Sequence, residues 1–90
     1  MWEIEYGSGW EKYFEKLDLA LKRIVVKRIE DIRDGKRKYK HLKFGVPFFK
    51  DEFNSQKCRI CFTEHAETNT RVLCFVGDHK EYEKWLGLKG

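Results

Sequence analysis

The residue types that could support chemistry gather in the last third of the chain. Arg59 lies in the middle of an apolar segment, and Lys50 and Glu52 share one side of the segment before it. His79 and Lys80 follow the glycine that ends the last apolar run. A planar guanidinium near lysines and a histidine suits an anionic substrate that carries phosphate. This pattern predicts a protein that acts on nucleic acid.

The length and composition predict one domain over residues 1–90. A chain of 90 residues has room for a single compact core, and 38% of its residues are charged. Its apolar runs are much shorter than a bilayer-spanning helix needs, so we expect no membrane association. The start Met1–Glu5 has neither the basic nor the apolar region of a signal peptide, which predicts a cytoplasmic location.

Positive charge is concentrated in one part of the chain. Residues 22–43 contain ten Lys or Arg against three acids, a net charge of +7, whereas the rest of the chain carries −3. A localised basic patch steers a polyanion toward the protein. A solvated helix face has the same composition, so charge alone does not decide between the two interpretations.

The three cysteines do not predict a metal site or a disulfide. Cys58 and Cys61 have a C-x-x-C spacing, and Cys74 lies in the next apolar run. Side chains three positions apart in a strand point to opposite faces, so this pair could not hold one metal ion. We expect buried reduced thiols, with no metal and no cofactor.

Periodicity predicts the element order β-α-α-β-β-β-α. Ser8 with Glu11 resembles a capping box, Asp18 is placed to cap a longer second helix, and Gly35 to end it. The expected elements are a strand at 2–6, a helix from 10, a helix from 18 to 35 with apolar positions 21, 24, 25, 29 and 32, strands at 48–53, 57–63 and 72–76, and a helix at 79–88.

Strand alternation predicts where the polar residues lie. Cys58, Ile60 and Phe62 share one face of their strand, which the two helices of a hairpin would cover. The other face then carries Arg59 and its polar neighbours, near the point where the last strand ends.

With these elements in place, the chain resembles the RelE/ParE superfamily of toxins from toxin–antitoxin pairs. The resemblance covers nearly the whole chain and rests on the helical hairpin, on Leu42–Gly45, on Cys58–Phe62 and on Phe75–Lys80. It implies an α+β fold, with an N-terminal strand and helical hairpin packed on one face of an antiparallel sheet and a short C-terminal helix. RelE-like members are endoribonucleases that cleave messenger RNA in the ribosomal A site without a metal, as mRNA interferases. ParE-like members inhibit DNA gyrase.

The resemblance implies roles for individual residues. Arg59 matches the strand arginine that contacts the scissile phosphate, and Lys50 matches the first of two strand lysines. The second lysine position holds Glu52, and the position of a late tyrosine holds Trp85, with Tyr82 three residues earlier. The implied catalytic set is Arg59, His79, Lys50, Glu52, Lys80 and Tyr82. The implied RNA-binding set is Lys36, Arg37, Lys38, Lys40, His41, Lys43 and Trp85.

RNA cleavage without a metal uses the 2′-hydroxyl as nucleophile. It needs a base, an acid for the leaving 5′-oxygen and cations beside the phosphorane. Glu52 could be the base and His79 the acid, with Arg59 and the lysines on the phosphate, and an aromatic ring could stack on a base. Each residue also has a structural interpretation: Arg59 could pair with Glu52 across strands, and Trp85 could be a core anchor.

Three functions therefore remain open at the level of the sequence. The first is a ribosome-dependent endoribonuclease, which the resemblance links to a cognate antitoxin, a 70S-type ribosome and mRNA. The second is a ParE-like gyrase inhibitor, and the third is a catalytically inactive RNA- or ribosome-binding relative. In the first case we expect the free toxin to be a monomer that forms a larger complex with its antitoxin.

Overall fold

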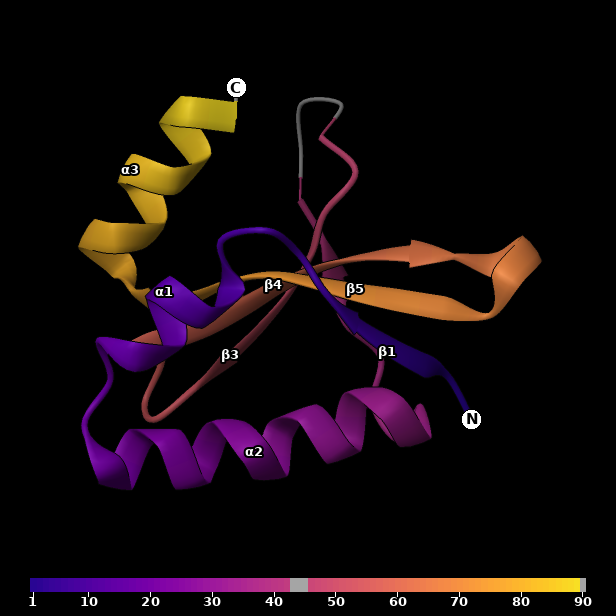
Figure 1. Ribbon diagram of the computed structural model, residues 1–90, viewed down its shortest axis with the longest axis horizontal. Coiled ribbons are helices and arrows are strands. Elements are labelled where there is room, and N and C mark those ends of the chain that lie inside the picture. Colours follow the sequence, from indigo (N-terminus) through magenta and orange to yellow (C-terminus); the bar gives the residue numbers. More distant parts are fainter. Residues whose placement is uncertain (43–45, 90) are drawn as a thin grey trace.

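A five-stranded sheet with helices on both faces forms the body of the molecule. The structure is a computed structural model that describes residues 1–42 and 46–89 (Figure 1). Its elements, in chain order, are β1 (Glu3–Tyr6), α1 (Trp10–Glu15), α2 (Leu19–Asp34), β2 (Lys40–His41), β3 (Phe49–Phe53), β4 (Cys58–His65), the 3₁₀ turn η1 (Ala66–Thr68), β5 (Thr70–Asp78) and α3 (His79–Lys89).

The strand order is β1-β5-β4-β3-β2, and the sheet is mixed rather than antiparallel. β1 runs parallel to β5, with Ile4 opposite Arg71, whereas the other neighbours are antiparallel. The expected α+β class is confirmed, but the expectation of an antiparallel sheet with the first strand on its face is wrong. A four-residue strand satisfies its backbone N–H and C=O groups only by pairing, and the open edge of β5 offers that pairing.

The ends of α2 form as its sequence predicts. The Asp18 carboxylate accepts a hydrogen bond of 2.8 Å from the Leu21 backbone N–H, and Gly35 closes the helix in the left-handed region at φ 69°. The expected capping box at Ser8 is wrong, because α1 begins after Gly9 without a side-chain cap. Backbone hydrogen bonds from Trp10 to Gly7 and from Tyr13 to Gly9 close that turn instead.

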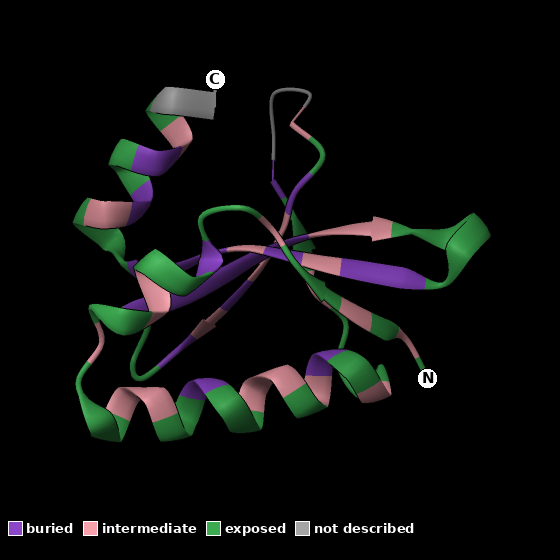
Figure 2. Cartoon of the chain, viewed as in Figure 1, coloured by how far each residue is buried: buried purple, intermediate pink, exposed green. Residues whose placement is uncertain are grey.

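The first core cluster lies between the helices α1 and α2 and one face of the sheet. Val25 and Ile32 of α2 are fully buried, and Trp10 of α1 joins them. Their partners on the sheet are Phe53, Cys58, Ile60, Phe62, Leu73 and Val76. Figure 2 shows the buried positions of α2 on the side that faces the sheet. Ile24, expected in this apolar stripe, is instead 37% exposed.

The second core cluster lies on the opposite face, under α3. It joins Tyr82 and Trp85 of α3 to Cys61 and Phe75 of the central strands, with Leu42 and Phe48 beside them. Cys58 and Cys61 therefore lie on opposite faces, as alternation predicted. The short C-terminal helix therefore covers this face over the central strands β4 and β5, which helical periodicity alone does not reveal.

Several element boundaries differ from the expectation. Lys40 and His41, expected in a connection, form the edge strand β2 against β3. β4 and β5 run further than their apolar cores, to His65 and from Thr70 to Asp78. Gly77 does not stop β5, since it pairs with Arg59 inside the ladder. Because β4 and β5 are hydrogen-bonded to each other along their whole length, both strands continue through their polar ends.

Candidate functional site

Three charged side chains from β3 and β4 meet on the face that α3 covers. Glu52 lies directly opposite Arg59 in the strand register, and Lys50 lies opposite Cys61. The Glu52 carboxylate contacts Arg59 Nη2 at 2.8 Å and Lys50 Nζ at 3.4 Å. Strand alternation therefore brings together the three residues that the sequence predicted on this face, and the cross-strand pair of Arg59 with Glu52 is present.

Arg59 is almost enclosed. Only 8% of its side chain is exposed, and its guanidinium carbon lies 4.4 Å from the centre of the Tyr82 ring. Its Nε is buried and has no hydrogen-bond partner in the described part of the chain. A buried guanidinium with an unused N–H retains donor capacity for an anion. The site is thus built around a cation whose hydrogen bonds are only partly satisfied.

Gly77 allows α3 to start close to this cation. A Cβ at this position would lie 2.8 Å from the Phe75 ring and 3.3 Å from the Cβ of Glu81. Because Phe75 is fully buried, its ring has little room to move. The absence of a side chain at Gly77 lets the first turn of α3 fold back over β5 and bring Tyr82 onto Arg59.

His79 and Lys80 lie at the exposed start of α3. The His79 Nε2 is 2.7 Å from a carboxylate oxygen of Glu83, and its ring centre is 6.2 Å from that of Tyr82. Tyr82 therefore contacts both Arg59 and His79. His79 is 63% exposed, so it lies at the rim of the site rather than inside it.

Tyr82 and Trp85 are both buried, at 8% and 3% exposure. Trp85 stacks on Phe75 at 5.1 Å and meets Phe48 edge-on at 4.7 Å. Burial raises the pKa of Tyr82, and the nearby Arg59 opposes this only in part. Tyr82 is therefore neutral at physiological pH and can act as a hydrogen-bond donor but not as a base.

Cys61 lies on the same face as Arg59 and is completely buried. Burial raises the pKa of its thiol to about 12, against the opposing effect of Arg59. Burial also raises the pKa of Cys58 on the other face. Neither thiol is ionised near neutral pH. The expectation of buried thiols therefore holds for these two cysteines, whereas Cys74 is only half-buried.

Much of the basic segment is engaged in ion pairs within the protein. Arg28 donates two hydrogen bonds to the buried carboxylate of Asp51, and one of them is 2.9 Å long. This contact raises the pKa of Arg28. Arg37 pairs with Asp31 at 3.3 Å, and Lys36 approaches Asp34 at 3.9 Å. The sequence does not predict the ion pair between Arg28 and Asp51, because Asp51 is visible there only as an acid next to Lys50 in a predicted strand.

The two residues of β2 lie on different faces. Lys40 is opposite Lys50 in the register, so it lies on the same face as Arg59. Arg59, Lys50 and Lys40 thus form a strip of cations that runs to the edge of the sheet. His41 is opposite Phe49, and their rings meet edge-on at 4.8 Å on the other face. His41 is therefore not part of the Arg59 cluster. Lys38 is exposed in the connection before β2, and Lys43 lies outside the described residues.

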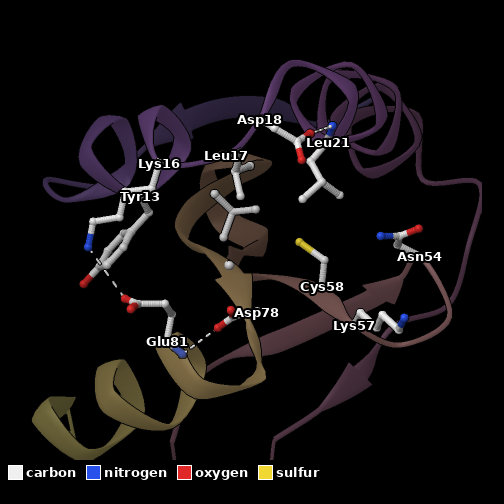
Figure 3. A pocket seen from close by; sticks show the side chains of 12 residues that line it. Tyr13, Lys16, Leu17, Asp18, Leu21, Asn54, Lys57, Cys58, Asp78 and Glu81 are labelled. Atoms are coloured by element: carbon white, nitrogen blue, oxygen red, sulfur yellow. Dashed lines mark hydrogen bonds and ion pairs between the residues drawn. The ribbon is translucent and has the colours of Figure 1, made fainter.

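A pocket of about 430 Å³ lies on the other side of the sheet from Arg59, between the start of α2, the β3–β4 turn and the start of α3. Figure 3 shows Cys58, Leu17 and Leu21 around its interior and charged side chains at its rim. Asp78 accepts a hydrogen bond from the Glu81 N–H, and Glu81 pairs with Lys16. These contacts cap α3 and tie it to α1, so the pocket rim helps to hold the helix that covers Arg59. This role of Asp78 was not among the predictions from the sequence, although an Asp before a helix is a capping signal.

In the described part of the chain, no group of three or more His, Cys, Asp or Glu side chains is arranged to hold a metal ion. None of the helices within residues 1–42 and 46–89 has the length and apolar character to cross a bilayer.

The backbone has the RelE-like toxin fold. The isolated RelE toxin of E. coli matches over 100% of both chains, with a TM-score of 0.74 at 14% sequence identity. The RelBE2 toxin–antitoxin complex of Mycobacterium tuberculosis matches over 87% of this chain and 91% of the other, with a TM-score of 0.74 at 17% identity. The conserved hypothetical protein HP0892 of Helicobacter pylori is 26% identical over 91% of this chain and 99% of its own, with a TM-score of 0.59.

At the level of sequence, no family model matches the chain. No curated protein matches it either. The likeness to solved structures therefore establishes the fold, and the function has to be argued from the residues of the site.

Proposed function

We propose that this chain is the toxin of a toxin–antitoxin pair and acts as a ribosome-dependent endoribonuclease on mRNA in the A site. The observation that carries the proposal is Arg59. It is a buried guanidinium whose Nε has no partner among the residues that the structure describes, and Lys50 and a glutamate lie beside it in a RelE-like fold. A cation enclosed in this way stabilises a phosphorane more strongly than one in open water.

The neighbours of Arg59 supply the remaining chemistry. Glu52 is an acceptor for the proton of the 2′-hydroxyl, and His79 is a donor for the leaving 5′-oxygen. Lys50 and Lys80 add positive charge, and the neutral Tyr82 can donate a hydrogen bond to a phosphate oxygen. In the RNA-binding set, Lys40 extends the strip of cations toward the sheet edge. Lys36, Arg37, Lys38, His41 and Lys43 would give general phosphate contacts.

Trp85 has a different role in this proposal from that implied by the resemblance. Its ring is packed between Phe48 and Phe75, so it anchors α3 over the site and does not offer a face to RNA. For RNA to reach Arg59, the C-terminal helix has to shift. The proposal therefore includes an opening of α3 on the ribosome.

Primer extension on mRNA in a translating extract tests the proposal. Wild-type protein should give cuts within A-site codons only when ribosomes are present, and Arg59→Ala should give none. Circular dichroism checks that the variant is folded, and Arg33→Ala, which removes an exposed arginine, is the matched control and should cut like wild type.

Three results would contradict the proposal. Normal cutting or normal growth inhibition by a well-expressed Arg59→Ala variant would remove Arg59 from the chemistry. Gyrase inhibition without cuts would favour a ParE-like activity. Ribosome binding without cuts would favour an inactive relative.

The partner in this proposal is an antitoxin, and the molecule has a surface suited to one. A groove of about 490 Å³ between β1, α1 and α2 is lined by Tyr6, Trp10, Phe14, Val26 and Ile29, among others. Tyr6 and Val26 are 57% and 51% exposed. Arg23 and Lys27 lie on the exposed surface of the same helix. Glu11 also lines the groove, whereas Arg23 and Lys27 line a separate basic pocket on the same helix. An amphipathic segment that places apolar side chains in the groove and acidic ones along the outer face of α2 matches this surface.

A charge placed in this groove tests the antitoxin surface. Val26→Glu should weaken binding of the cognate antitoxin without unfolding the chain, because the side chain is half exposed. Lys12→Glu, at an exposed position of α1 outside this apolar lining, is the control. NMR shifts confined to other faces on antitoxin binding would contradict this surface.

A further inference from the structure

The carboxylate of Glu52 holds both cations of the candidate site at once. One oxygen lies 2.8 Å from Arg59 Nη2 and the other lies 3.4 Å from Lys50 Nζ. Glu52 therefore has the contacts that two oxygens of a phosphate would make with the same pair. Its own side chain is 26% exposed, so it can turn outward from the strand into solvent.

An incoming phosphate competes directly with this contact. A guanidinium binds two oxygens through adjacent N–H groups, and Nη2 of Arg59 already donates to Glu52. The buried Nε is available but can provide only one of the two bonds. A phosphate oxygen placed on Nη2 would also lie beside the negative carboxylate, which is a costly arrangement in an enclosed site.

We propose that Glu52 is an internal anion that occupies the phosphate position on Arg59 and Lys50. The site then takes a phosphodiester only when the Glu52 side chain leaves, so this residue sets the affinity for phosphate. The inference rests on the proposed function, because it concerns the same site and names what regulates it. It also gives a physical role to the position where the resemblance places a second lysine.

A purely structural role for Glu52 makes the opposite prediction. If the carboxylate serves to hold the guanidinium in position, its loss should disorder Arg59 and weaken anion binding. If it occupies the anion position, its loss should strengthen anion binding. The sign of the change therefore separates the two roles.

Inorganic phosphate is a suitable probe, since it is far smaller than an RNA strand and reaches the site from the side where Lys50 and Glu52 are partly exposed, without an opening of α3. We would titrate wild type and Glu52→Gln with phosphate at constant ionic strength and follow the Arg59 Nε–H by ¹⁵N NMR. Glutamine keeps the shape of the side chain and removes its charge. We expect the dissociation constant for phosphate to fall about tenfold in Glu52→Gln, as relief of a like-charge contact predicts.

Two control variants make this result specific. Glu64→Gln removes the same charge from the other strand glutamate that pairs with a buried arginine, and should leave phosphate affinity within about twofold of wild type. Adding Arg59→Met to Glu52→Gln should abolish the gain. Equal or weaker phosphate binding by folded Glu52→Gln would overturn the inference.

A measurement on the wild type covers the case in which Glu52→Gln does not fold. The side-chain carboxyl ¹³C signal of Glu52 should shift together with the Arg59 Nε–H as phosphate is added. A shift at Arg59 with none at Glu52 would overturn the inference without any variant.

Cleavage assays separate this inference from the proposed function. If wild type cuts mRNA but Glu52→Gln binds phosphate no more tightly, only the internal-anion role falls. If Glu52→Gln binds phosphate more tightly but wild type makes no cuts, the internal-anion role stands and the nuclease proposal falls. If Glu52 is also the base, the Glu52→Gln variant should cut mRNA more slowly than wild type although it binds phosphate more tightly.

Discussion

Two buried arginines on neighbouring strands look alike but differ in how completely their hydrogen bonds are used. Arg59 and Arg71 are both 7% exposed, and each pairs with a glutamate on an adjacent strand at 2.8 Å. Each also lies against an aromatic ring, Tyr82 at 4.4 Å and Trp2 at 4.3 Å. Residue type, burial and partner are therefore the same at the two positions.

The difference lies in the remaining N–H groups. Arg71 donates from Nε and Nη2 to Glu64 and from Nη1 to the backbone carbonyl of Ile32. The rings of Tyr39 and Phe62 complete its surroundings. Arg59 leaves its buried Nε without a partner in the described part of the chain. A saturated arginine ties elements together, whereas an unsaturated one retains capacity for a ligand.

The largest expected effect is on stability at Arg71. Arg71→Met should lower the free energy of unfolding by about 3–5 kcal/mol, since it leaves a carbonyl and a carboxylate without their partner. Urea unfolding followed by circular dichroism measures this change. Arg33→Met, at an exposed surface pair, is the control and should stay within about 0.5 kcal/mol of wild type. A loss at Arg71 no larger than the control's would refute the structural role.

A smaller loss of stability is expected at Arg59. Arg59→Met should cost about 1–2 kcal/mol, because Glu52 keeps Lys50 as a partner. Its effect on mRNA cleavage should nevertheless be about 100-fold or more, as for the loss of a group that stabilises transition-state charge. Urea unfolding and primer extension on the same samples check both values. An Arg59→Met variant that is as unstable as Arg71→Met would erase the distinction between the two arginines.

The rings that cover the two arginines give a third comparison. Trp2→Leu and Tyr82→Leu each remove a contact between a cation and a ring, worth about 0.5–2 kcal/mol. Both should therefore destabilise the fold by a similar amount. Only Tyr82→Leu should change the dissociation constant for inorganic phosphate, because Arg59, unlike Arg71, has an Nε–H without a partner in the described part of the chain. Equal effects on phosphate binding would show that neither arginine is specific for the anion.

The smallest effect concerns Tyr39, which lies beside Arg71. Burial raises its pKa to about 12, and its hydroxyl has no hydrogen-bond partner in the described part of the chain. Because the unfolded tyrosine ionises near pH 10, it loses its proton before the folded one does. The unfolded state is thereby favoured, and stability should fall as pH rises from about 10 to 12.

Tyr39→Phe should reduce this alkaline loss. At pH 7 it should leave stability almost unchanged, since the hydroxyl makes no hydrogen bond to any described residue. Urea midpoints at several pH values between 7 and 11 measure both effects. A wild-type decline identical to that of Tyr39→Phe would contradict the raised pKa.

Much of this molecule could be predicted from its sequence because local signals were strong. Asp18 and Gly35 mark the ends of α2, and alternation around Arg59 placed Glu52 and Lys50 on its face. These features depend on helix capping and on the period of a strand, which act over a few residues. They were predictable because the residues that determine them lie next to one another in the sequence or on neighbouring strands.

Tertiary structure decided the rest, because these features depend on contacts between distant segments. The position of β1 decides its parallel pairing with β5. The position of α3 decides that Tyr82 covers Arg59 and that Trp85 is buried. The contrast between Arg59 and Arg71 is of the same kind. In the sequence, both arginines lie at an apolar run with a glutamate nearby. Only the fold supplied Arg71 with the Ile32 carbonyl and left Arg59 Nε without a partner in the described part of the chain.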